Sequence, residues 1–163
     1  MKIRHFLLLL VVVMSSWAVG CAPQGGGMDY LDTGGRGEVK GEMSGVAFSA
    51  LVELLPMGEG VSVEYLSPDS ICGLKFLAKG DECQVTLGEL SFVCSTHEVA
   101  GFLRPATAFL LYGDANSLQR DGENLVLHFS AKGTLTLSSA GTPISLVRDD
   151  IRLQVVWWEE GGC

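Results

Sequence analysis

The feature that most constrains the fold of this chain is an alternation of apolar and polar residues, repeated in many short segments. In residues 46–54, Val46, Phe48 and Val52 fall on one parity while Glu53 falls on the other. A period of two places alternate side chains on opposite faces, which is typical of a half-buried β-strand. The pattern recurs at residues 61–67, 74–80, 82–88, 89–93, 125–129, 135–137, 143–147 and 151–158. We therefore predict a mainly β fold, a curved antiparallel sheet or half barrel of about eight strands.

Turn residues between these segments predict how neighbouring strands pair. Residues 57–60 form a four-residue loop, Gly80 with Asp81 turns the next hairpin, and residues 131–133 form a three-residue loop. These turns keep the apolar residues of successive strands on one face. The predicted opposing pairs are Leu54 with Val63, Val52 with Tyr65, Val85 with Phe92, Leu146 with Leu153, and Ile144 with Val155. The predicted shared core includes Leu127, Leu137, Leu146, Leu153 and Val155.

In residues 96–113 the spacing between apolar residues changes from every second position to every third or fourth position. This helical stripe predicts one helical excursion in the middle of the chain, ended by Gly113, so the fold class is α+β. Pro105 lies inside the stripe, and proline removes a helical hydrogen bond. We expect either a kink or two short helices, which cover the apolar face of the sheet.

Five phenylalanines fall on the predicted inner faces of this arrangement. The strands contribute Phe76, Phe92 and Phe129, and the helical stretch contributes Phe102 and Phe109. If they converge on one space, they either line an apolar pocket or fill a core. The sequence leaves both alternatives open.

The first 20 residues read as a secretory signal. Lys2 and Arg4 precede nine apolar residues, a run too short to span a bilayer. The sequence Ala18-Val19-Gly20 then leads into Cys21 and resembles the lipobox of bacterial lipoproteins. That resemblance implies cleavage before Cys21 and a covalent lipid on its sulfur. It also implies an extracytoplasmic protein anchored to the bacterial cell membrane, or to an outer membrane where the host has one.

The mature chain is predicted to have a tether and one domain. Residues 21–44 are rich in glycine and have no apolar period, so we expect a flexible tether before a domain at 45–163. Loss of the two signal-peptide cations changes the formal charge from −8 to −10. This acidic balance disfavours nucleic acid and adsorption to anionic lipid, so the membrane partner is held through the anchor.

Parts of the domain resemble the LolA/LolB-like lipoproteins and lipoprotein carriers. The resemblance rests on GVSVEYLSPDSICGLKFLAKGDECQVTLGELSF, the helical stretch, and GTLTLSSAGTPISLVRDDIRLQVVWW. It implies an incomplete barrel closed by helices around an apolar cavity that binds acyl chains. We expect no cofactor apart from the covalent lipid on Cys21.

The remaining reactive side chains form no recognised catalytic or metal motif. A turn at Gly88-Glu89 would place Cys83 opposite Cys94, which permits either a cross-strand disulfide or two buried thiols. The spacing of Cys72, Cys83, Cys94 and Cys163 contains no Cys-x-x-Cys, so no metal site is predicted. His97 and His128 lack a nucleophile or carboxylate at motif spacing, so we expect no enzyme.

Two functional hypotheses follow from the sequence. In the first, the anchored domain binds an apolar ligand, such as an acyl chain or lipoprotein tail, between sheet and helix. In the second, its interior is filled, and it acts as a structural or interaction lipoprotein of the cell envelope or in sporulation. The sequence identifies no protein partner for either.

Overall fold

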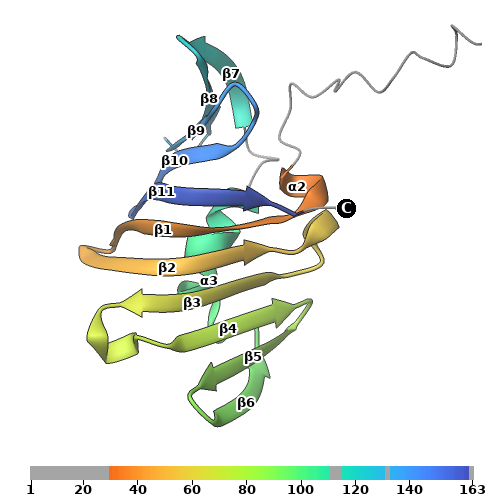
Figure 1. Cartoon of the computed structure of the whole chain (residues 1–163), viewed down its shortest axis with the longest axis vertical. Helices are drawn as coiled ribbons and strands as arrows, with labels where there is room; N and C mark the ends of the chain where they lie inside the picture. Colours follow the sequence, from red (N-terminus) through yellow and green to blue (C-terminus); the bar gives the residue numbers. More distant parts are fainter. Residues whose placement is uncertain (1–29, 111–114, 131–132, 162–163) are drawn as a thin grey trace, which may run out of the picture.

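A computed structural model describes residues 30–110, 115–130 and 133–161. They form one open antiparallel sheet of 11 strands in the order β6-β5-β4-β3-β2-β1-β11-β10-β9-β8-β7 (Figure 1). In Figure 1 the strands turn from nearly horizontal at β1–β4 to nearly vertical at β7 and β8, so the sheet is strongly twisted. The strands are β1 (Gly35–Met43), β2 (Val46–Leu54), β3 (Val61–Ser67), β4 (Leu74–Lys79), β5 (Glu82–Leu87), β6 (Leu90–Ser95), β7 (Ala115–Asp121), β8 (Asn124–Phe129), β9 (Gly133–Leu137), β10 (Pro143–Arg148) and β11 (Ile151–Glu160).

Short helices precede the first strand and occupy several connections between strands. The α-helix α3 (Ala100–Thr107) runs directly into the 3-10 turn η3 (Ala108–Leu110) and contacts β2, β3 and β4. In Figure 1 it lies behind the sheet. The other short elements are α2 (Tyr30–Thr33), η1 (Pro56–Gly58) and η2 (Asp69–Ile71).

The helical excursion is confirmed, and it takes the form of one α-helix with Pro105 inside it. Leu103 and Ala106 of α3 and Phe109 of η3 are buried, as the stripe predicted. The predicted helix end at Gly113 lies outside the described residues.

The expected number of about eight strands is wrong. Two strands have weak sequence patterns: β1 lies within the segment expected to be a tether, and β7 is an exposed edge strand. The tether prediction is therefore wrong for residues 35–43, and the ordered domain begins before residue 45. These residues are held because β1 pairs with β2 on one side and β11 on the other.

Two of the predicted apolar pairs are confirmed: Val85 lies opposite Phe92, and Leu146 opposite Leu153. The β8–β9 hairpin differs from the prediction, because Phe129 pairs with Gly133 and Leu127 with Leu135. Gly133 therefore belongs to β9 and not to the expected loop at 131–133, and the two-residue shift in register keeps these leucines on the inner face. The β2–β3 hairpin differs by two residues, because Leu54 pairs with Val61 and Val52 with Val63. The longer loop contains η1, and the two-residue shift leaves the same side chains on the inner face.

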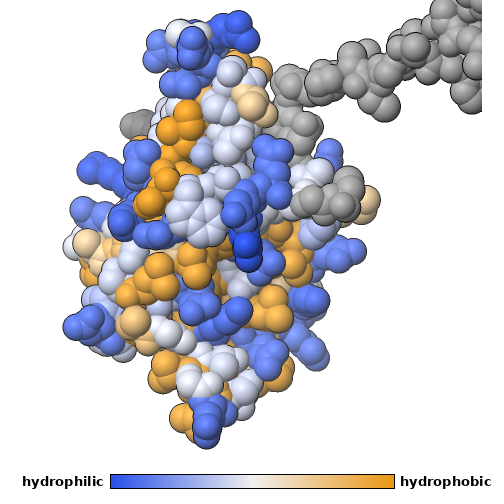
Figure 2. Space-filling view, viewed as in Figure 1, coloured by the Kyte–Doolittle hydropathy of each residue, from blue (hydrophilic) through white to orange (hydrophobic). Residues whose placement is uncertain are grey.

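The hydrophobic core lies between α3, η3 and the sheet face that contacts them. Leu127, Leu137, Leu146 and Leu153 are buried in this cluster, and Val155 packs against it. The prediction that these five residues share one core is confirmed. The opposite face of the sheet, called here the outer face, is the one toward the viewer in Figure 2, where hydrophilic and apolar side chains are interspersed.

Candidate functional site

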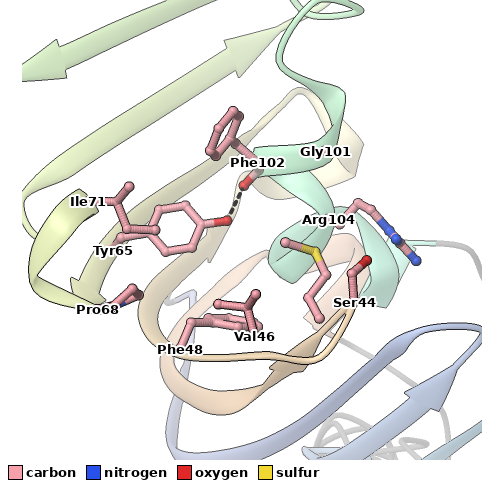
Figure 3. A pocket seen from close by; sticks show the side chains of 10 residues that line it. Ser44, Val46, Phe48, Tyr65, Pro68, Ile71, Gly101, Phe102 and Arg104 are labelled. Atoms are coloured by element: carbon pink, nitrogen blue, oxygen red, sulfur yellow. Dashed lines mark hydrogen bonds between the residues drawn. The ribbon is translucent and has the colours of Figure 1, made fainter.

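An apolar pocket opens between one end of the sheet and the first turns of α3 (Figure 3). Its volume is about 400 Å³. The side chains that line it are almost all apolar, and they come from the β1–β2 turn, β2, β3, the η2 turn and α3. The lining residues are Met43, Ser44, Val46, Phe48, Tyr65, Pro68, Ile71, Gly101, Phe102 and Arg104.

The β1–β2 turn positions one wall of the pocket. Ser44 and Gly45 both have positive φ, 51° and 81°, which suits a two-residue hairpin turn between Met43 and Val46. Val46 follows the turn on the inner parity of β2 and is 59% exposed at the mouth. An apolar side chain is therefore presented to solvent at the entrance.

Tyr65 joins the sheet to the helix beneath the pocket. Its hydroxyl donates a hydrogen bond to the Phe102 carbonyl oxygen at 3.0 Å, the bond drawn in Figure 3. Its ring makes an edge contact with Phe48, with centroids 5.9 Å apart. Burial raises the pKa of Tyr65 to about 12, so the hydroxyl stays protonated and remains a donor.

The charged groups beside the pocket lie at its rim. Arg104 Nη2 forms an ion pair with Asp150 Oδ1, and the Ser44 hydroxyl donates to Oδ2 of the same carboxylate. The hydrogen bond from Arg104 has the largest effect on the pKa of Asp150, and that from Ser44 adds to it. Together they lower this pKa to about 2. In Figure 3 the guanidinium of Arg104 points away from the apolar side chains. The pocket therefore combines an apolar interior with a polar edge.

The five predicted phenylalanines do not converge on this pocket. Phe102 lines it, is 42% exposed, and stacks on buried Phe76 with centroids 5.1 Å apart. Phe109 is buried against Trp158, and Phe129 is buried beneath the Arg148 guanidinium. Phe92 is 59% exposed on β6, the edge strand of the sheet.

Sequence reasoning missed most of the pocket lining. The alternation places Val46 and Phe48 on the correct face of β2. It does not show which residues of that face pack under the helix and which line an open pocket. The position of the η2 turn relative to α3 leaves Ile71 and Pro68 facing the pocket. This placement depends on tertiary packing, so no local pattern indicates it.

Cys83 and Cys94 lie directly opposite each other on β5 and β6, as predicted. Both are free thiols, and the Cys94 Sγ lies 3.7 Å from the Cys83 carbonyl oxygen, to which it donates. Burial, with a smaller contribution from Cys94, raises the pKa of the Cys83 thiol. Cys72 is exposed, and Cys163 lies outside the described residues.

Other predicted chemistry can be located only in part. The signal residues Ala18, Val19 and Gly20 and the lipid-attachment residue Cys21 lie outside the described residues. Within the described ranges, no group of three or more His, Cys, Asp or Glu side chains could hold a metal ion. The helices that can be described there are too short or too polar to cross a bilayer.

Comparison with known proteins places the fold but not the activity. No protein-family model matches the sequence, and no curated protein matches it. Similar solved structures include an uncharacterized conserved protein from Thermus thermophilus, at 18% identity and a TM-score of 0.52, covering 83% of this chain and 84% of that one.

Two further similar structures have TM-scores below 0.5. MucB is 14% identical with a TM-score of 0.49, covering 83% of this chain and 57% of its own. A LolA superfamily protein from Nitrosomonas europaea is 15% identical with a TM-score of 0.33, covering 77% of this chain and 70% of its own. At these identities the common property is the general fold, a mainly β architecture that this chain shares with the Thermus protein.

Proposed function

We propose that this chain is a membrane-anchored, non-enzymatic protein that binds the apolar part of an amphiphilic ligand, such as an acyl chain or lipoprotein tail. The observation that carries the proposal is the pocket of about 400 Å³ between the sheet and α3, with its nearly continuous apolar lining. Ligand sites are typically concave, of about 300–1,000 Å³, and mainly apolar with a few polar groups. An acyl chain would lie against Phe48, Ile71 and Phe102, and a polar head would remain at the rim.

The proposed anchor is the lipid on Cys21. The motif Ala18-Val19-Gly20-Cys21 supports it, and so does the acidic composition of the chain, whose formal charge is −8. An acidic body gains nothing from an anionic membrane surface, so covalent acyl chains would supply the attachment. The proposed location is the extracytoplasmic face of the bacterial cell envelope.

A second candidate is an interaction lipoprotein with a filled interior. Three of the five phenylalanines, Phe76, Phe109 and Phe129, are buried in the core rather than exposed to a cavity. This packing favours a protein that acts through its surface in the envelope or in sporulation. Ligand binding decides between the two candidates.

Gly101 provides a direct test of the pocket. It lines the pocket in α3, and a Cβ atom at this position would have no neighbour within 4 Å. Gly101→Phe should fill the space and weaken binding of an environment-sensitive fluorescent fatty acid by more than about tenfold, a loss of about 1.4 kcal/mol. The measurement is a fluorescence titration of residues 22–163 and of the variant.

Gly101→Ala is the matched control. Alanine adds only a methyl group, so binding should persist, and better helix propensity should stabilise the fold by about 0.5–1 kcal/mol. Thermal melts of both variants would show that the pocket variant is folded. Absence of saturable binding by the unsubstituted protein would reject the carrier and favour the interaction lipoprotein.

The anchor has its own test. Cys21→Ser cannot form the thioether, so the variant should incorporate no fatty-acid analogue during growth of the host and should accumulate as unprocessed precursor. Labelling of the variant as strong as that of the unsubstituted chain would contradict the anchor without affecting the pocket.

A further inference from the structure

A second hollow lies on the outer face of the sheet, on the side opposite α3. Its volume is about 410 Å³, and it crosses strands β11, β1, β2, β3 and β4. The residues whose side chains define it are Trp157, Arg36, Leu51, Glu53, Glu64 and Lys75. The core and the apolar pocket lie on the other face, so this groove is a separate feature of the molecule.

The strand registers explain the shape of the groove. One row of directly opposed residues runs Trp157, Glu38, Leu51, Glu64, Lys75 across the five strands. The next row runs Glu159, Arg36, Glu53, Ser62, Leu77. Neighbouring strands are about 4.8 Å apart, so the four steps from β11 to β4 span about 19 Å. The groove is therefore elongated and suits an extended ligand.

Ser62 gives the groove its depth. It is a small residue opposite Glu53 on one neighbouring strand and Leu77 on the other, and it is only 4% exposed although it lies on the outer face. The longer side chains around it form walls, and the serine forms part of the floor.

Trp157 provides an aromatic surface at one end. A register shift between Glu38 and Val39 places Trp157 opposite Glu38 on the outer face and Trp158 opposite Gly37 on the inner face. Trp158 packs with Tyr30 and Phe109 in the core. Trp157 is 38% exposed and lines the groove. Trp157 is held in the sheet by its pairing with Glu38 of β1, so the surface is preformed.

The charges of the groove favour a neutral polar ligand. Arg36 and Lys75 are cationic, whereas Glu53 and Glu64 are anionic. Lys75 lies 4.0 Å from Glu64, and Arg36 donates two hydrogen bonds of 2.9 Å to Glu159 at the margin. A bound anion would be repelled by the carboxylates of Glu53 and Glu64. A bound cation would be repelled by Arg36 and Lys75. A ligand with many hydroxyl groups could use both the donors and the acceptors.

We propose that this outer-face groove binds a neutral oligosaccharide, with the apolar face of one sugar ring stacked on Trp157 and its hydroxyl groups bound by Glu53, Glu64 and Arg36. A saccharide combines a C–H face with vicinal hydroxyls, and an aromatic ring beside carboxylates and a guanidinium complements both. An amino-sugar polymer and a glucan share this chemistry. The proposal does not depend on the apolar pocket.

The test uses the full chain as its host produces it, purified in a polyoxyethylene detergent, which contains no sugar. Chitotetraose and maltotetraose are titrated separately by calorimetry, and the comparison of the two identifies an amino-sugar or a glucan source. Saturable binding of either is expected, weakened about tenfold or more in Trp157→Ala and partly restored in Trp157→Phe. Detergent that enters the apolar pocket leaves the outer face free, so this result is independent of acyl-chain binding.

Two further variants keep the test decisive. Phe92→Ala removes another exposed ring, on β6 away from the groove, and should leave the affinity unchanged. Glu53→Gln keeps the size of an exposed side chain and should weaken binding severalfold without a change in melting temperature. The proposal is overturned if neither tetrasaccharide saturates, if Trp157→Ala binds as well as the unsubstituted chain, or if an anionic probe, tri-galacturonate, binds instead of both.

Discussion

Asp150 connects two parts of the pocket rim that are far apart in the sequence. Its carboxylate accepts from Ser44 in the β1–β2 turn and pairs with Arg104 of α3, while its carbonyl oxygen accepts from the Ser44 N–H at 3.0 Å. The side chain is partly exposed, so solvent screens the ion pair. The effect of these contacts is chiefly to fix the relative positions of the turn and the helix.

The lowered pKa of Asp150 predicts a pH dependence of stability. Its folded pKa of about 2 lies below the usual 3.8, so the carboxylate stabilises the fold above pH 3.8 and this contribution is lost as the pH falls toward 2. Asp150→Asn should therefore lower the melting temperature at pH 7, and the difference from the unsubstituted protein should shrink below about pH 4.

Thermal melts from pH 7 to pH 3 measure this difference. Asp121→Asn is the control for loss of a carboxylate, because Asp121 is exposed at the end of β7. A melting-temperature difference for Asp150→Asn that stays constant down to pH 3 would show that Arg104 and Ser44 do not depend on its charge.

The elements that the sequence predicts well are those with an apolar side chain at every second position and a defined turn. The β5–β6 hairpin has both, so the predicted pairing of Val85 with Phe92 is correct. β7 lacks the pattern, because Leu118 is its one large apolar side chain, and most of its residues are exposed at the edge of the sheet. A strand of this composition carries no alternation from which it could be predicted.

The alternation pattern fails to predict β1 for a different physical reason. Its inward positions include Gly35 and Gly37, which read as tether, but the ring of Trp158 occupies the space that their side chains would need. A Cβ atom at position 37 would lie 2.7 Å from the Trp158 ring, and one at position 35 would lie 2.8 Å from it. The alternation of glycine with Arg36 and Glu38 is a usable signal, since glycine in a strand often marks close approach.

The candidate pocket is predictable only in outline. A helical cover over an apolar sheet face follows from the change in period, and the main sheet contacts of α3 are with β2, β3 and β4. Phe92, on β6, is 59% exposed, whereas Phe76 and Phe109 are buried in the core. The length and position of the helix decide which residues of the inner face remain uncovered. The spacing of apolar residues in the sequence carries no information on either.

At the scale of the whole molecule, the first and last described strands join two meanders. Strands β2–β6 follow one another on one side, β7–β10 on the other, and β1 with β11 forms the seam between them. Val39 at this seam is fully buried, and Gly161 N–H donates to the Gly34 carbonyl oxygen beyond the strand end. The 11-stranded sheet is therefore continuous only while β1 is in place.

This arrangement predicts the outcome of a truncation at the boundary that composition suggested. A fragment of residues 45–163 lacks β1, so β2 and β11 lose their common partner and the buried side of each becomes an exposed edge. We expect no cooperative thermal transition from this fragment, measured by circular dichroism, and a cooperative one from residues 30–163. If the shorter fragment melts cooperatively within a few degrees of the longer one, the two meanders can associate without β1, and the seam is not required for folding.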